Sequence, residues 1–208
     1  MSIKAVVFDY GRVISLPQDM AAINRMAEMV GVERGRFEAA LWGLRSDYDR
    51  GTIGAREYYM EVLAELSVEA EDNLIDKIIK MDLASWSEVN GETVALMEDV
   101  KKAGYTLGIL SNMPREFLAW ARENLPVFLL PQIGLFSCEV NLIKPEEAIY
   151  QKLFSMLASK GVASGAEVVF FDDLVENIKG AEALGIKACL WKDPENARRE
   201  LLSLGVSL

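Results

Sequence analysis

Hydrophobic residues follow two different periods along the chain. Between residues 15 and 88 they recur at helical spacing, as in Ile23, Met26 and Val30 before Gly31. This spacing is typical of amphipathic helices that bury one face. We predict four such helices in this stretch, separated by short breaks and packed together as a small bundle.

Short runs of β-branched and aromatic residues predict the strands of a buried parallel sheet. The expected strands are 3–9, 105–110, 168–171 and 187–190, with a further short strand contained within 133–140. From residue 90 onward they alternate with helices. The expected helices are 93–103, 117–124, 146–159 and 175–184. This alternation predicts an α/β protein with a doubly wound, Rossmann-like parallel sheet.

The helical stretch therefore interrupts the sheet after its first strand. We predict an α/β core domain formed by residues 1–14 and 89–208, with residues 15–88 inserted as a helical cap domain. The chain of 208 residues is long enough for a full hydrophobic core.

Composition excludes several classes of function. The 22 basic and 32 acidic residues give a net charge of −10, which argues against nucleic acid or an anionic membrane surface as partner. No apolar run approaches the roughly 20 residues of a membrane span, and the N-terminal residues read as a strand rather than a signal peptide. Cys138 and Cys189 are too few for a disulfide framework. We therefore expect a cytoplasmic protein, whose oligomeric state the sequence does not indicate.

The chain contains no histidine. This excludes Ser-His-Asp and Cys-His hydrolysis, histidine-based zinc sites and histidine general bases. Nucleophilic or acid–base chemistry must therefore come from other residue types, among which clustered aspartates have few competitors.

Acidic residues stand at the ends of two predicted strands. Asp9 follows the first strand, and Asp172 and Asp173 follow the strand at 168–171. Ligands of open α/β sheets bind beyond the carboxyl ends of the strands, so adjacent strands would bring three carboxylates into one crevice. Such charges repel each other unless a cation or a shared proton offsets them. The pattern predicts a divalent metal site with a carboxylate left for chemistry, although a lone aspartate here is also a common helix cap.

Four sequence blocks carry a family resemblance. They are Phe8-Asp9-Tyr10-Gly11-Arg12-Val13-Ile14, then Leu110-Ser111-Asn112, then Lys144-Pro145, and finally Phe171-Asp172-Asp173 with Asn177. Each block alone is a weak signal. In this order, and at these positions relative to the predicted strands, the chain resembles the haloacid dehalogenase-like hydrolases, in the subfamily with a helical cap inserted after the first strand.

The resemblance implies a role for each block. Asp9 would be the nucleophile that forms an aspartyl-phosphate, with Lys144 pairing with it and with the phosphate. The implied ligands of a Mg²⁺ ion are Asp9, the backbone carbonyl of Gly11, Asp172 and Asp173. Ser111 and Asn112, with neighbouring backbone N–H groups, would bind phosphate oxygens. Asn177 would steady Lys144 or the acidic loop.

One position departs from the family pattern. Most family phosphatases have a second aspartate two residues after the nucleophile, as general acid and base, whereas this chain has Gly11 followed by Arg12. Glycine occurs here in branches that resemble sugar-phosphate phosphatases. Glycine still has the backbone carbonyl that could bind the metal, but it has no side chain to transfer a proton. General acid–base catalysis contributes about 10²–10⁴-fold to the reaction rate. Either the substrate has a good leaving group, another residue such as Arg12, Glu57 or Tyr48 contributes, or the enzyme is slow.

We predict a Mg²⁺-dependent hydrolase acting on a small phosphorylated metabolite such as a sugar phosphate. Two alternatives remain: a 2-haloacid dehalogenase, which also lacks the second aspartate but needs no metal, and a catalytically impaired relic that binds phosphate or a partner. The Asp172-Asp173 doublet favours the phosphatase.

In the cap, we expect Arg45 to reach a sugar or carboxylate substituent from a loop, and Trp42 to be core.

Overall fold

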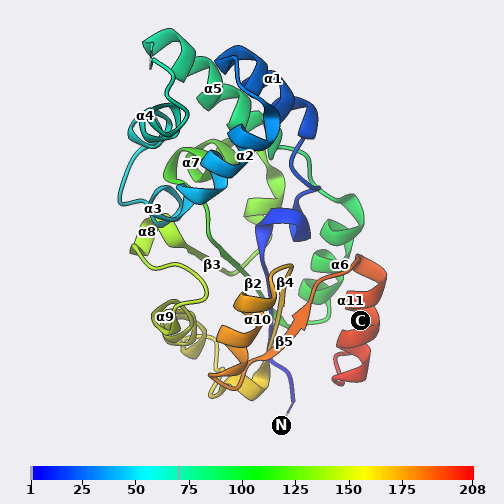
Figure 1. Ribbon diagram of the computed structural model, residues 1–208. Coiled ribbons are helices and arrows are strands. Elements are labelled where there is room, and N and C mark those ends of the chain that lie inside the picture. The colour runs from blue at the N-terminus through cyan, green and yellow to red at the C-terminus, as the bar shows by residue number, and fades with distance from the viewer. Residues whose placement is uncertain (1, 70) are drawn as a thin grey trace.

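The computed structural model describes residues 2–69 and 71–208. Its centre is a parallel sheet in the order β3-β2-β1-β4-β5 (Figure 1). The strands are β1 (Ala5–Phe8), β2 (Thr106–Ser111), β3 (Ile133–Phe136), β4 (Val168–Asp172) and β5 (Lys187–Leu190). Every neighbouring pair is parallel, which confirms the predicted doubly wound α/β fold.

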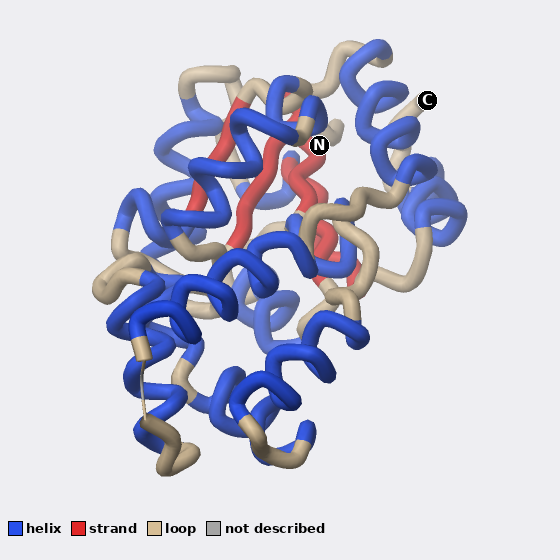
Figure 2. Tube along the Cα trace, turned by 90° about the horizontal axis from the view of Figure 1, so that it is seen from above, coloured by secondary structure: helices blue, strands red, loops and turns tan. Residues whose placement is uncertain are grey.

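Helices cover both faces of the sheet (Figure 2). One face packs against α6 (Gly91–Lys102), α7 (Arg115–Asn124) and α11 (Pro194–Ser203), and the other against α9 (Glu147–Ala158) and α10 (Val175–Glu182). Alternate side chains of a strand point to opposite faces. Accordingly, Val6 and Phe8 of β1 join the first hydrophobic cluster, and Ala5 and Val7 join the second. The central strand is buried on both faces, which is why its sequence is continuously apolar.

A group of helices, which we call the cap helices, lies beyond the carboxyl ends of the strands (Figure 1). They are α1 (Met20–Val30), α2 (Arg34–Gly43), α3 (Arg45–Arg50), α4 (Ala55–Glu65) and α5 (Asp72–Ser85). They enclose their own hydrophobic cluster, in which Tyr48 stacks on Tyr58 with ring centroids 4.5 Å apart. The predicted number of four is wrong for the described part of this stretch. The additional helix α3 has six residues with a single apolar side chain, so it leaves no periodic signal.

Local signals explain where several helices begin and end. Asp19 accepts a hydrogen bond from the Ala21 N–H at the start of α1, and Gly31 ends that helix in a left-handed conformation. Asn90 caps α6 in the same way as Asp19 caps α1. Shorter helical segments lie at α8 (Ser137–Val140) and at Tyr10–Ile14, Pro126–Leu129 and Gly165–Glu167.

The cap helices approach the core closely. The two connecting segments meet at an antiparallel bridge between Ser15 and Val89. Farther away, Arg50 forms an ion pair with Glu146 at 2.6 Å. Gly51 has φ of +79°, and a Cβ there would come within 2.7 Å of the Cys138 backbone, so both conformation and space require glycine. Within the described ranges, no helix combines the length and apolar character needed to cross a membrane.

Candidate active site

The predicted site residues meet where three strands end. Asp9 directly follows β1, Ser111 is the last residue of β2, and Asp172 is the last residue of β4. Because β1 pairs with both β2 and β4, these three strand ends are neighbours. The crevice expected from the sequence is therefore formed, and both acidic segments contribute to it.

Lys144 links the two acidic segments. Its Nζ lies 2.9 Å from Asp9 Oδ1 and 2.6 Å from Asp172 Oδ2, and its side chain is almost fully buried. Although burial alone lowers the pKa of Lys144, the two carboxylates raise it, so the ammonium stays charged.

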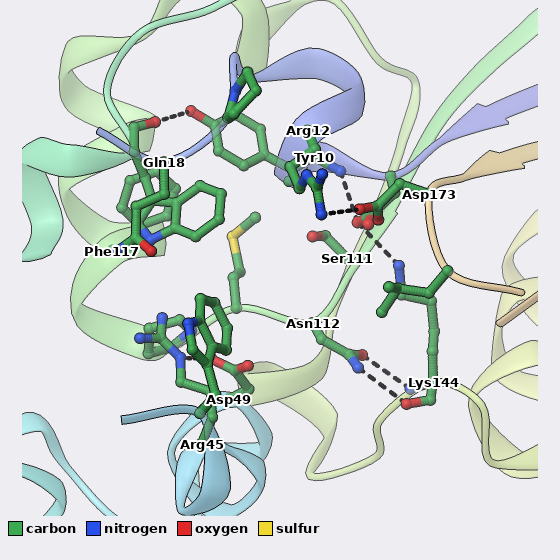
Figure 3. Close-up of a pocket in the computed structure, with 18 of the residues that line it drawn as sticks. Tyr10, Arg12, Gln18, Arg45, Asp49, Ser111, Asn112, Phe117, Lys144 and Asp173 are labelled. Carbon is green, nitrogen blue, oxygen red and sulfur yellow. Dashed lines mark hydrogen bonds and ion pairs between the residues drawn. The ribbon is translucent and has the colours of Figure 1, made fainter. Parts of the chain in front are cut away.

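Asn112 holds the backbone of Lys144. Its Oδ1 accepts from the Lys144 N–H at 2.9 Å, and its Nδ2 donates to the Lys144 carbonyl at 3.0 Å (Figure 3). This paired contact fixes the residue from which the buried ammonium extends. Asn112 also lines the adjoining cavity, but its amide is already engaged, so its observed role is to position Lys144.

Both oxygens of Asp172 have partners. Oδ2 contacts Lys144, and Oδ1 accepts from Asn177 Nδ2 and from the Leu174 N–H, each at 2.9 Å. Asn177 thus steadies the acidic loop, one of the two roles suggested by the sequence. The contact with Leu174, immediately before α10, also shows that Asp172 combines a local turn contact with its place in the site.

The aspartates form a potential cation site. Asp9, Asp172 and Asp173 each offer a carboxylate oxygen, and these atoms lie within 4.8 Å of one another. Burial and the charge of Asp172 raise the pKa of Asp9 to about 7, against the opposing effect of Lys144. Burial and Asp172 likewise raise the pKa of Asp173. A buried oxygen-only cluster whose charges destabilise one another fits a hard divalent cation such as Mg²⁺.

Arg12 faces the same cluster. Its backbone has φ of +59°, and its N–H donates to Ser15 Oγ at 3.0 Å. Figure 3 shows its guanidinium directed toward Asp173, at 3.4 Å, while the side chain is 60% exposed. Arg12 is therefore a partner of the candidate metal ligand Asp173.

A cavity of about 550 Å³ opens between the aspartates and the cap helices. Much of its wall is apolar or aromatic, from Tyr10, Met20, Trp42, Trp86, Met113 and Phe117. The prediction that Trp42 is core is wrong: its side chain is 48% exposed and meets Trp86 edge-to-face at 6.2 Å. Helical periodicity identifies an apolar residue but not whether it faces the cap interior or the cavity.

Arg45 lies at the cap side of the cavity, opposite Asp173 (Figure 3). It belongs to α3 rather than to the expected loop, and it is buried. Its Nε contacts Asp49 Oδ1 at 2.8 Å, and its Nη1 contacts Asp82 Oδ2 at 3.2 Å. Two carboxylates therefore already balance its charge.

Asp82 was missed by the sequence reasoning. It is buried in α5, where it also accepts from Gln18 Nε2 at 3.1 Å. The signal that reveals it is an acidic residue on the otherwise apolar face formed by Ile75 and Ile78. Such a residue predicts a buried cationic partner, here Arg45.

The other residues suggested as contributors to proton transfer lie elsewhere. Tyr48 is buried in the cap interior, where burial raises the pKa of its hydroxyl. Glu57 lies on α4, beside a separate shallow hollow that includes Met60 and Glu116. Of the three residues considered, Arg12 is the one that lines the main cavity.

Carboxylates and a lysine meet at the strand ends of a doubly wound sheet, with helices inserted after the first strand, which defines the class as an α/β protein with a candidate active site at the carboxyl edge of its sheet. The particular family follows from the sequence match. The family model of haloacid dehalogenase-like hydrolases matches residues 3–185, and the chain belongs to this family.

Curated relatives of two kinds are similar to the chain. It is 27% identical to Phosphatase MT3486 of Mycobacterium tuberculosis over 222 residues, which cover 100% of this chain and 98% of that protein. It is 26% identical to Bifunctional epoxide hydrolase 2 of Sus scrofa over 217 residues, covering 97% of this chain. The chain spans only 38% of the length of that epoxide hydrolase.

Solved structures share the fold. A HAD family enzyme of Bacteroides thetaiotaomicron, in complex with magnesium and inorganic phosphate, has a TM-score of 0.73 and 21% identity, covering 92% of this chain and 95% of that chain. A predicted HAD-like family hydrolase of Porphyromonas gingivalis has a TM-score of 0.75 and 24% identity, covering 100% of both. An L-2-haloacid dehalogenase of Xanthobacter autotrophicus has a TM-score of 0.69 and 18% identity, covering 99% and 85%. At these identities the likeness establishes the fold alone.

Proposed function

We propose that the protein is a Mg²⁺-dependent phosphatase of a small phosphorylated metabolite, with Asp9 as the nucleophile. The observation that carries this proposal is the third carboxylate, Asp173, beside Asp9 and Asp172. Three clustered carboxylates, of which Asp9 and Asp172 are buried and Asp173 is partly exposed, suit a cation that binds a phosphate, whereas displacement of a halide needs no such cluster. The name of the mycobacterial relative and the magnesium–phosphate complex of the Bacteroides enzyme support the same assignment.

Asp9, Asp173 and the backbone carbonyl of Gly11 are the groups that would hold Mg²⁺. Asp172 is close to them, but its oxygens are already bound by Lys144, Asn177 and Leu174. When bound, the ion would offset the charge of the phosphate and of the carboxylates.

The chain's own residues supply the nucleophile and its surroundings. An oxygen of the Asp9 carboxylate attacks phosphorus and displaces the leaving group, forming an aspartyl-phosphate. Water then attacks this phosphorus and releases phosphate, which regenerates Asp9. Lys144 and the Ser111 hydroxyl both stabilise the charged form of Asp9, since contact with either lowers its pKa. They are placed to bind phosphate oxygens as well.

We also propose the domain roles expected from the sequence. Residues 1–14 and 89–208 form the catalytic core, and residues 15–88 form a cap that covers the cavity. The cap contributes Trp42, Arg45 and Asp49 to its wall. Closure would exclude bulk water from the aspartyl-phosphate until the leaving group has departed.

The test is phosphate release from sugar phosphates, acetyl phosphate and p-nitrophenyl phosphate, with Mg²⁺ or with chelator. We expect release that requires Mg²⁺ and is lost in Asp9→Asn. Asp76→Asn is the control, because Asp76 is 62% exposed on a cap helix. Borohydride reduction during turnover should convert the phosphorylated Asp9 to homoserine, which mass spectrometry detects.

Other outcomes select the alternatives. Halide release from 2-haloacids without metal, and no phosphate release, would identify a dehalogenase. Phosphate binding without turnover of any substrate would identify a catalytically impaired relic.

A further inference from the structure

The wall of the cavity at position 11 is aromatic instead of acidic. Gly11 has φ of −60° and ψ of 124°, a conformation open to any residue. A Cβ built there would lie 3.8 Å from Cζ3 of Trp86, which is ordinary van der Waals contact. Neither the backbone nor local crowding therefore explains the glycine. The indole ring of Trp86 faces the space into which a side chain at position 11 would extend.

The acidic groups on the cap side of the cavity are already paired. Asp49 accepts from Arg45, and Glu38 lies 3.5 Å from Arg34. The Tyr10 hydroxyl donates to the Trp86 carbonyl at 2.8 Å, and burial raises its pKa. A substrate whose leaving group departs as a stable anion needs no proton from any of these residues.

The shape and chemistry of the wall suit a planar apolar ring. Met20 and Trp42 are 43% and 48% exposed, and both line the cavity. Trp42 and Trp86 stand edge-to-face, an arrangement that can accept a third ring. Arg45 lies 5.5 Å from the Trp42 ring but is neutralised by its carboxylates, so it offers no free charge to a second anionic group.

We infer that the substrate of the proposed phosphatase is an aryl phosphate, whose ring packs against Trp42, Trp86 and Met20 and whose phenolic oxygen is the leaving group. This inference rests on the proposed function. Gly11 supplies no proton donor, and the aromatic wall beside it selects a substrate that does not require one. A cavity of about 550 Å³ is large enough for a substituted ring and its phosphate.

The chemical steps balance without a general acid for the leaving group. Asp9 attacks phosphorus, the P–O(aryl) bond breaks, and its electron pair leaves on the phenolate oxygen. Water then cleaves the aspartyl-phosphate, and the proton released in that step neutralises the phenolate. Aryl phosphate and water thus give phenol and phosphate. A phenol has a pKa of about 10, whereas an alcohol resembles water at about 15.7, so only the aryl oxygen leaves readily unprotonated.

Leaving-group chemistry is tested on the wild-type enzyme with Mg²⁺. Phenyl phosphate and benzyl phosphate both carry a ring, but only the first releases a phenol. We expect kcat/KM to be at least ~100-fold higher for phenyl phosphate, because the lost proton transfer is worth about 10²–10⁴-fold. Equal kcat/KM for the two compounds would show an effective proton donor and overturn the inference.

Recognition of the ring is tested by binding, independently of turnover. Calorimetry should show phenylphosphonate binding at least ~10-fold more tightly than methylphosphonate, as expected for burial of a ring. Trp42→Ala and Met20→Ala should reduce this ratio. Met60→Ala is the matched control, since Met60 is a 50% exposed cap methionine beside the separate hollow on α4, and the ratio should stay unchanged.

The outcomes separate the inference from the proposed function. The aromatic subsite would be overturned by equal affinity for the two phosphonates, or by an equal decrease of the affinity ratio in Met60→Ala and Met20→Ala. Mg²⁺-dependent phosphate release would in that case still support a phosphatase. No phosphate release from any compound, acetyl phosphate included, would refute the phosphatase and the aryl substrate together.

Discussion

Replacement of Asp9, the proposed nucleophile, should stabilise the metal-free protein in a pH-dependent way. Asp9 is buried, and its pKa in the folded protein is raised from 3.8 to about 7, mainly by burial. Both short contacts of its side chain, from the Tyr10 N–H at 2.7 Å and from Lys144 Nζ at 2.9 Å, go to Oδ1. Asparagine can keep both with its carbonyl oxygen while removing the charge.

The sign follows from proton linkage. A carboxyl group whose pKa is higher in the folded state binds more protons when folded, so stability falls as pH rises from 3.8 to about 7. The folded-state pKa of about 7 lies roughly two pH units above pH 5. Over this range the free energy of unfolding falls by ~1.4 kcal/mol for each pH unit. Ionisation of Asp9 should therefore cost the metal-free protein about 3 kcal/mol between pH 5 and pH 8, and Asp9→Asn should escape this cost.

The assay is urea unfolding with chelator at pH 5 and pH 8. The free energy of unfolding of Asp9→Asn, relative to wild type, should increase by about 3 kcal/mol from the lower to the higher pH. The surface variant Asp76→Asn should track wild type at both. If wild type and Asp9→Asn changed in parallel, the raised pKa of Asp9, and the reasoning from burial, would be wrong.

Three further substitutions test other contacts of the site. Lys144→Met leaves two buried carboxylates without their cation, and urea unfolding at pH 8 should show a loss of about 3–5 kcal/mol; a loss below 1 kcal/mol would contradict the buried ion pairs. Arg12→Ala frees Asp173 from its partner at 3.4 Å, so calorimetry should show tighter Mg²⁺ binding, whereas unchanged affinity would mean that the pair does not compete. Gly11→Asp restores an acid beside Trp86, and benzyl phosphate turnover should rise by at least ~10-fold, an increase that a purely steric effect would not produce.

The parts of the fold that the sequence predicts well are those that depend on burial from both sides. The residues of β1 and β4 are entirely buried, so their apolar runs were unambiguous. Their ends also located the site, because parallel strands finish at the same edge and β1 lies between β2 and β4. The sequence predicted convergence of Asp9 and Asp172 on condition that their strands are adjacent, and the strand order of the structure meets this condition.

Other features depend on contacts that no local pattern specifies. Helix α11 buries little more than Ala197 and Leu201 among charged residues, so its apolar stripe is too narrow to stand out. Arg45 was expected to reach a substrate substituent from a cap loop. Its partner Asp82 lies 37 residues away on another helix, so no local pattern indicates the contact between them. The identity of a buried ion pair depends on how helices pack, which periodicity does not determine.

The charges at the site constrain how a phosphate can be accepted. The cluster contains three carboxylates, from Asp9, Asp172 and Asp173, with an oxygen of each within 4.8 Å of the others, and two cations, from Lys144 and Arg12. With all groups ionised the cluster carries one excess negative charge, and a phosphate dianion would add two more to a largely buried space. Burial, together with the repulsion from Asp172, raises the pKa values of Asp9 and Asp173 in the absence of substrate. A divalent cation would reverse the sign of the cluster. The charges that destabilise the metal-free fold would then also make binding of the proposed phosphate substrate depend on the metal.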